Sequence, residues 1–306
     1  MEKRPSLFTA FFTIFRPGLI LAVLLTTLLG LGIARQLAVP INISNAILGF
    51  VLVILLLESR AFLEAFYRHP TAPENRMAHN TKVDDPYLAA VEQFQRPALL
   101  YISIVILGAG AFLTTVMAVQ GQLSPSVYLL LGVGFLLCFF SSVPPVELSE
   151  RGYAEVVESL LVTLLAPALT LALQMRELHL LVILLSLPLT FVYLALRIVK
   201  SLETYGRDSL LKRQVMLLRI GWQKGMNLHN FSLIGSYLLT GIFALLLLPW
   251  SLTWPYLLSL PFAVFQIFQV QQIANGARPN WRLLNLAAAA TFGVTAYSIT
   301  LTLWIR

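Results

Sequence analysis

Charged residues inside long apolar runs are the side chains of this sequence that could do chemistry. An ionisable group at membrane depth is energetically costly, so each one is a candidate for function. In the run 43–67, Arg60 and Glu64 are four residues apart and share a helix face, with Glu58 two residues before Arg60. Two interpretations stay open: an ion-paired helix end whose Arg60 head reaches interfacial water, or the lining of a polar cavity.

A second acidic pair opens the run 154–175, where Glu155 and Glu158 are three residues apart. Negative charge is favourable at a helix N-terminus, so this pair is either a stabilising helix start or part of a site. Seven lysines and arginines between 197 and 224 face only Glu203 and Asp208 in the sequence. This cationic stretch binds anionic lipid headgroups or recognises a phosphate or diphosphate.

Several familiar soluble-enzyme motifs do not occur in the sequence. No cluster of His, Cys, Asp and Glu has zinc-like spacing, and there is no phosphate-binding glycine loop or nucleophile elbow. Cys138 is the single cysteine, so it has no internal disulfide partner and is expected to be a packing residue.

The composition sets the environment in which these residues work. Of 306 residues, 58% are hydrophobic and 11% are charged, and the mean hydropathy is +0.80, whereas soluble domains carry about 25% charged residues. The apolar runs are continuous and about 20 residues long, which fits spanning helices rather than alternating barrel strands. The sequence therefore predicts an all-α integral membrane protein, a nine-helix transmembrane bundle. The predicted spans are 17–37, 43–67, 97–120, 126–142, 154–175, 178–199, 230–250, 254–273 and 283–304.

The basic residues predict an orientation for one transmembrane domain, residues 1–306, with cap loops at about 68–96 and 200–229. Seventeen of the 21 lysines and arginines lie on the side of the N-terminus, three lie on the other side, and Arg60 lies within a span. By the positive-inside rule the N-terminus and both cap loops are cytoplasmic and the C-terminus is outside, in a cell (inner or plasma) membrane. The net charge of +7 follows from this topology, so no nucleic-acid partner is expected.

Five short motifs, taken in order, resemble the UbiA superfamily of intramembrane prenyltransferases, and especially its menaquinone-branch members. The nine spans and the long loops after spans two and six resemble the layout of that family. The motifs are Phe15-Arg16-Pro17 with Leu29-Gly30; Asn75-Arg76; Pro144-Pro145-Val146-Glu147-Leu148; Arg151-Gly152-Tyr153-Ala154-Glu155; and Lys212-Arg213 with Gly221.

The resemblance implies a chemistry and a site. Such enzymes hold magnesium with two aspartate-rich motifs, at the ends of spans two and six, and bind a prenyl diphosphate. The metal and nearby cations stabilise the departing diphosphate while the prenyl group alkylates an acceptor. If this chain is active, Mg²⁺ is therefore its expected cofactor, with no metal ligand assigned.

The sequence departs from the family at both magnesium motifs. The first motif would fall at 59–63, which reads Ser59-Arg60-Ala61-Phe62-Leu63 without an aspartate. At the second motif, Ser201 and Tyr205 occupy the two aspartate positions. Activity is therefore expected to be altered or absent.

Three hypotheses follow from these observations. The first is a prenyltransferase of isoprenoid or quinone-type lipid metabolism with a rearranged site. The second is a non-catalytic protein that binds an isoprenoid, quinone or pigment, or a subunit of a larger membrane complex with partner chains. The third is a small-solute transporter. The candidate catalytic residues are Glu58, Glu64, Glu203 and Asp208, and the candidate substrate-binding residues are Arg60, Asn75, Arg76, Glu155, Tyr205, Lys212 and Arg213.

Overall fold

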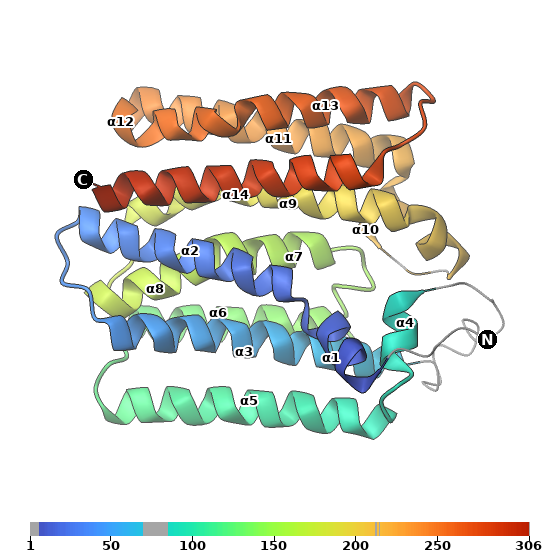
Figure 1. Cartoon of the computed structure of the whole chain (residues 1–306). Coiled ribbons are helices and arrows are strands. Elements are labelled where there is room, and N and C mark those ends of the chain that lie inside the picture. The colour runs from blue at the N-terminus through green and yellow to red at the C-terminus, as the bar shows by residue number, and fades with distance from the viewer. Residues whose placement is uncertain (1–5, 70–84, 212, 214, 306) are drawn as a thin grey trace.

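The computed structural model describes residues 6–69, 85–211, 213 and 215–305, which form a bundle of long helices (Figure 1). The helices are α1 Leu7–Phe15, α2 Pro17–Gln36, α3 Ile43–Tyr67, α4 Pro86–Val91, α5 Arg96–Val119, α6 Pro125–Ser142, α7 Ala154–Leu160, the π-helical η3 Leu161–Leu165, α8 Ala166–Met175, α9 Leu180–Leu210, α10 Met216–Ile220, α11 Trp222–Leu246, α12 Trp250–Thr253, the 3₁₀-helical η4 Trp254–Ser259, α13 Leu260–Ala274 and α14 Trp281–Ile305.

The predicted number of spans is confirmed for the part of the chain that the structure describes. Nine helical segments there are long and apolar enough to cross a membrane. The first combines α1 and α2, the fifth runs from α7 through η3 to α8, and the eighth runs from α12 through η4 to α13. Helices α1 and α4 lie at one end of the bundle and the last turn of α14 lies at the other (Figure 1). The fold is therefore a polytopic helical membrane bundle, as predicted.

The helix starts follow local chemistry. Asn42 and Ser124 cap α3 and α6 by accepting hydrogen bonds from the backbone amides three residues ahead. Asp85 caps α4 by accepting from the backbone N–H of Tyr87, two residues ahead, at 2.9 Å, and Pro86 occupies the first turn. The caps fix where each helix leaves its connecting loop.

Most of the described residues in the predicted cap loop over 200–229 are helical. Helix α9 continues to Leu210, and α10 and the start of α11 occupy much of the rest. After residue 199, buried apolar residues such as Leu202 alternate with polar residues. The mean hydropathy of this segment is therefore low, although the helix continues. In the other predicted loop, 68–96, the described residues include the short helix α4.

The buried centre of the bundle is formed by the fifth and sixth spans. In their most apolar windows, 83% and 72% of the residues are buried, against 11% in α5, which lies at the edge of the bundle (Figure 1). Helix α2 approaches α8 closely at Gly30, where an added Cβ would lie 2.6 Å from the backbone oxygen of Pro167. Small residues allow this backbone approach between membrane helices.

Gly30→Ala is expected to destabilise the protein by about 1–3 kcal/mol, because two helix backbones must move apart to admit one methyl group. The measurement is the midpoint of thermal unfolding in detergent. Gly18→Ala is the matched control on the same helix, since a Cβ there meets nothing within 4 Å. Equal midpoints for the two variants would contradict the proposed close contact.

Candidate functional site

A charged cavity of about 220 Å³ lies at the end of the bundle where α1 and α4 are found. Its walls come from the α1–α2 junction, α3, α4, α7, α9 and the segment after α9. Seven cationic side chains and five carboxylates line it: Arg16, Arg60, Arg68, Arg197, Lys200, Arg207, Arg213, Glu64, Asp85, Glu155, Glu158 and Asp208. Arg60 thus lines a polar cavity and also takes part in the ion pairs at the end of α3.

Glu158 is the carboxylate with the most cationic neighbours in the cavity, and its side chain is only 2% exposed. Its Oε2 lies 3.2 Å from Nη1 of Arg16 and 3.8 Å from Nη1 of Arg60. Its Oε1 accepts a hydrogen bond from the Tyr193 hydroxyl at 3.1 Å and lies 3.2 Å from Nε of Arg197. One carboxylate thus joins helices α3, α7 and α9 and the α1–α2 junction.

The position of Arg16 depends on an unusual backbone conformation. Arg16 has φ 47° and ψ 70°, in the left-handed region, and it both ends α1 and precedes α2. Few non-glycine residues adopt this conformation. The bend between the two helices brings the guanidinium within reach of Glu158.

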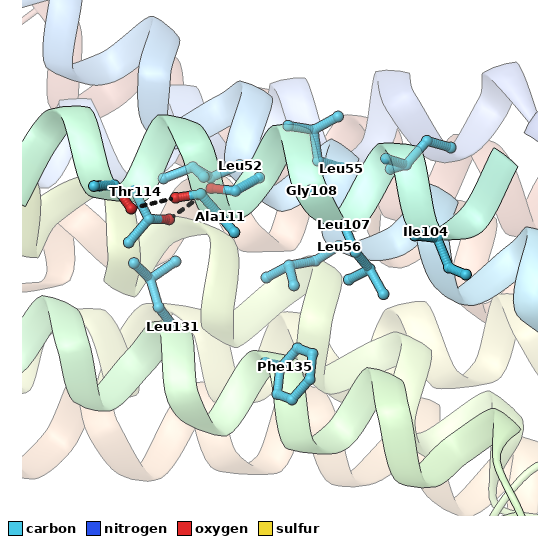
Figure 2. Close-up of a pocket in the computed structure, with 13 residues that line it drawn as sticks. Leu52, Leu55, Leu56, Ile104, Leu107, Gly108, Ala111, Thr114, Leu131 and Phe135 are labelled. Atoms are coloured by element: carbon cyan, nitrogen blue, oxygen red, sulfur yellow. Dashed lines mark hydrogen bonds between the residues drawn. The ribbon is translucent and has the colours of Figure 1, made fainter. Parts of the chain in front are cut away.

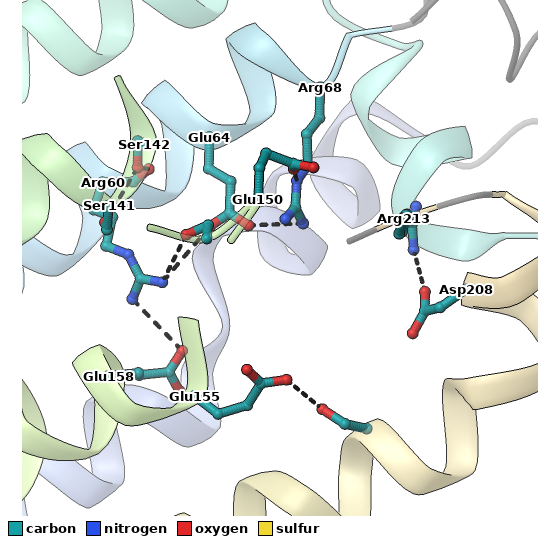
Figure 3. Close-up of polar contacts among 12 residues, drawn as sticks. Arg60, Glu64, Arg68, Ser141, Ser142, Glu150, Glu155, Glu158, Asp208 and Arg213 are labelled. Atoms are coloured by element: carbon teal, nitrogen blue, oxygen red, sulfur yellow. Dashed lines mark hydrogen bonds and ion pairs between the residues drawn. The ribbon is translucent and has the colours of Figure 1, made fainter. Parts of the chain in front are cut away.

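A chain of ion pairs follows the last turns of α3 (Figure 3). Nη2 of Arg60 lies 4.0 Å from Oε2 of Glu64, and Oε1 of Glu64 lies 2.7 Å from Nη1 of Arg68. Arg68 also donates from Nε to Oε1 of Glu150 at 2.8 Å. Burial by itself lowers the pKa of Arg68, but the carboxylates of Glu64 and Glu150 outweigh burial and hold the pKa above its ordinary value. Arg68 therefore stays charged.

Arg213 connects α4 to the end of α9. Its Nη1 donates to Oδ1 of Asp208 at 3.0 Å, its Nη2 donates to Oδ2 of Asp85, and its guanidinium lies 5.9 Å from the centre of the Tyr87 ring. Thr204 donates to the other oxygen of Asp208 at 2.6 Å. Burial and the nearby charge of Glu64 raise the pKa of Tyr87 to about 12, so this phenol is neutral at physiological pH.

Glu155 faces the position of the second family motif. Its Oε1 accepts a hydrogen bond from the Ser201 hydroxyl at 2.7 Å, and its Oε2 is buried without a hydrogen-bond partner among the described residues (Figure 3). Both Glu155 and Glu158 are buried, so this acidic pair contributes to the cavity wall as well as to the start of α7.

The structure brings together some of the residues that the sequence selected. Arg60, Glu64, Glu155, Asp208 and Arg213 all line the charged cavity. Glu58 lies beside it, lining a much smaller cavity of about 10 Å³ together with Arg16, Arg60, Glu64 and Glu158.

Two of the selected residues lie outside the cavity lining. Glu203 is exposed and accepts a hydrogen bond from Nδ2 of Asn285 at 2.7 Å. Tyr205 packs edge-on against Trp222, with 5.0 Å between ring centres. The structure therefore does not bring these two residues into the charged cavity with the other candidates, and their roles stay predictions. Both lie on the flanks of α9, because the cavity-facing residues follow the helical repeat through Arg197, Lys200, Thr204 and Arg207.

Asn75, Arg76 and Lys212 lie outside the described residues. Several lining residues are not among the candidate catalytic and substrate-binding residues, among them Arg16, Arg68, Asp85, Glu158 and Arg197. The Arg16-Pro17 motif and the spacing of Glu158 from Glu155 were available signals for two of them. Nothing in the sequence marked Asp85.

The described residues do not fit the magnesium ions that the resemblance implies. Among the parts of the chain that the structure describes, no three His, Cys, Asp or Glu side chains are placed to hold a metal ion. Glu64, Glu158, Asp85 and Asp208 each pair with arginine. Magnesium requires several free hard oxygen ligands.

An apolar groove of about 630 Å³ runs between α3, α5 and α6 (Figure 2). Gly108, Gly110 and Ala111 leave room on the α5 side, and Leu56 and Phe135 line the other walls. Leu56 precedes Arg60 by one helical turn on α3, so one wall of the apolar groove leads toward the charged cavity. The apolar groove has the character of a site for a hydrocarbon chain.

The fold is shared with solved membrane prenyltransferase structures, although no protein-family model and no curated protein matches the sequence. A UbiA homologue from Archaeoglobus fulgidus bound to DMAPP and Mg²⁺ is 15% identical with a TM-score of 0.66, covering 93% of this chain and 98% of that one. The same homologue bound to GPP and Mg²⁺ is 14% identical with a TM-score of 0.67, covering 94% and 99%. A digeranylgeranylglyceryl phosphate synthase structure is 11% identical with a TM-score of 0.65, covering 99% and 100%.

The bundle and its charged end thus define a multi-pass helical membrane protein. Within that class, the chain has the fold of the UbiA-type membrane prenyltransferases, over nearly its whole length and theirs.

Proposed function

We propose that this chain is a UbiA-superfamily homologue of isoprenoid or quinone-type lipid metabolism that binds a prenyl diphosphate in the membrane. The observation that carries the proposal is the charged cavity, where cations outnumber carboxylates at one end of this fold. A diphosphate is a concentrated anion, and arginine forks match its oxygens.

The apolar groove is the proposed binding site for the prenyl chain of this ligand. Its lining is mostly aliphatic or aromatic (Figure 2). Isoprenoid chains are hydrocarbons, so they gain contact with such a wall without leaving polar groups unpaired. The diphosphate would then lie near Arg60 and the chain near Leu56 and α5.

The distribution of basic residues supports an orientation for the protein. The charged cavity lies on the side of the N-terminus, which carries most of the lysines and arginines, so the proposal places the cavity at the cytoplasmic face of the cell membrane. A water-soluble diphosphate headgroup is accessible there.

The first two hypotheses, a prenyltransferase and a non-catalytic binding protein, differ in whether the bound prenyl group is transferred to an acceptor. The departures at both magnesium motifs favour binding with altered or absent transfer. The solved structures named above are those of a UbiA homologue and a digeranylgeranylglyceryl phosphate synthase, which favours either hypothesis over small-solute transport. The menaquinone-branch likeness and any partner chain stay predictions.

The test uses the purified full chain in detergent with radiolabelled geranylgeranyl diphosphate. Saturable binding is the expected result. Absence of binding up to the critical micelle concentration of geranylgeranyl diphosphate would overturn the proposal. Pyrophosphate release with a panel of aromatic acceptors then separates a transferase from a binding protein.

Ala111→Trp tests the apolar groove. We expect it to weaken geranylgeranyl diphosphate binding on the order of tenfold, because the indole fills the space between α5 and α6. Inorganic pyrophosphate should compete equally well for both proteins, since the charged cavity is unchanged. Ala109→Trp is the matched control, because Ala109 is exposed on the same helix and does not line the groove. Equal effects of the two variants would exclude the groove as the chain site.

A further inference from the structure

The five carboxylates of the charged cavity already have partners inside the protein. Glu64 pairs with Arg68 at 2.7 Å, Glu158 with Arg16 and Arg197 at 3.2 Å, and Arg213 joins Asp85 to Asp208. The remaining one, Glu155, accepts a hydrogen bond from Ser201. At the four carboxylates other than Glu155, a divalent cation would have to displace a guanidinium group to bind, and each displaced arginine would lose its counter-charge.

Several donors in the same cavity have unused capacity. Arg60 is 4% exposed, and its Nε has no hydrogen-bond acceptor among the described residues. Nε of Arg207 is also buried without a hydrogen-bond acceptor among the described residues. Lys200 is an exposed cation that also lines the cavity. A buried guanidinium N–H without an acceptor is costly, so these groups are suited to an incoming anion.

These donors surround the cavity from two sides. Arg60 projects from α3, while Lys200 and Arg207 lie two turns apart on one face of α9. Guanidinium and ammonium groups on opposite walls can bind different oxygens of the same ligand. Figure 3 shows the Arg60 head directed toward Glu158 of α7 and Glu64 of its own helix.

Resting on the proposed function, we infer that the charged cavity binds the diphosphate of its ligand directly on arginine and lysine, without magnesium. The arginines that hold the carboxylates supply the positive charge that metal ions would otherwise provide. Arg60 occupies the range expected for the first metal motif, so a cation side chain stands where a metal ligand was expected. Binding, rather than metal-assisted departure of the diphosphate, is what these residues are arranged to do.

The experiment measures the Kd of geranylgeranyl diphosphate for the full chain in detergent, in 5 mM EDTA and in 5 mM MgCl₂, by microscale thermophoresis. We expect the two Kd values to agree within about threefold, since no metal joins ligand and protein. Lys200→Ala and Arg207→Ala should each raise the Kd about tenfold in EDTA, because each removes a charge-assisted hydrogen bond. Lys224→Ala is the matched control, because Lys224 is exposed and lies outside the cavity lining.

The outcomes separate the inference from the proposed function. Binding that occurs in MgCl₂ and is lost in EDTA overturns metal-free recognition but leaves the prenyl diphosphate proposal standing. Absence of binding in both buffers overturns the proposed function. Competition by inorganic pyrophosphate in EDTA supports recognition of the diphosphate itself. Competition by phosphatidic acid in mixed micelles, but not by pyrophosphate, would assign the cationic site to a membrane lipid and overturn the inference.

Discussion

Glu158→Gln is expected to lower the free energy of unfolding by about 3–5 kcal/mol, the cost of breaking a buried ion cluster from one side. Glu158 is buried, and its carboxylate contacts Arg16, Arg60 and Arg197. The glutamine keeps the size of the side chain but leaves three guanidinium groups without their shared counter-charge. Thermal unfolding in detergent measures the loss.

Three further measurements make this prediction specific. Glu150→Gln is the matched control: it also removes a carboxylate paired with arginine, but its side chain is 40% exposed, so the change is expected below about 1 kcal/mol. The double variant Glu158→Gln with Arg197→Gln should recover part of the stability, because it removes one unpaired cation together with the carboxylate. Added pyrophosphate should stabilise Glu158→Gln more than the unmodified protein. Identical midpoints for Glu158→Gln and Glu150→Gln would contradict the central role of Glu158.

Arg213→Ala is expected to detach α4 from the end of α9. Arg213 donates to both Asp85 and Asp208, and it is the contact that joins these two carboxylates. Removing it leaves two buried carboxylates near one another, at a local cost of about 2–3 kcal/mol. Hydrogen exchange of the α4 backbone amides from Tyr87 to Val91 measures this cost as a loss of protection of more than tenfold.

Arg213→Lys distinguishes geometry from charge. A lysine keeps the positive charge but has no planar fork to reach two carboxylates, so we expect it to restore only part of the protection. Arg219→Ala is the control on the neighbouring segment, since Arg219 donates to the backbone oxygen of Arg151 instead. Protection of α4 that is unchanged in Arg213→Ala would mean that other contacts hold this helix.

The described part of the bundle shows which features a sequence reveals without a structure. Continuous apolar runs located the nine spans, because lipid permits few other ways to satisfy a backbone. The same hydropathy reading ended the sixth span at 199, although α9 continues to Leu210. Beyond that point one face is polar because it lines a cavity, and a hydropathy average does not distinguish such a face from a loop.

The sequence by itself determined the membrane environment, the helical class, and the presence of charged residues near the ends of spans two, five and six. Only the tertiary structure decided which of those residues meet. Arg16 reaches Glu158 across 142 positions, and Arg213 reaches Asp85 across 128, through helix packing that no local pattern encodes. Helical phase directs Glu203 and Tyr205 to the flanks of α9 and Arg207 to the cavity. The physical reason is that a charge inside a membrane protein is tolerated only beside an opposite charge or a hydrogen-bond partner. The packing of helices that are distant in sequence determines which of these groups come into contact.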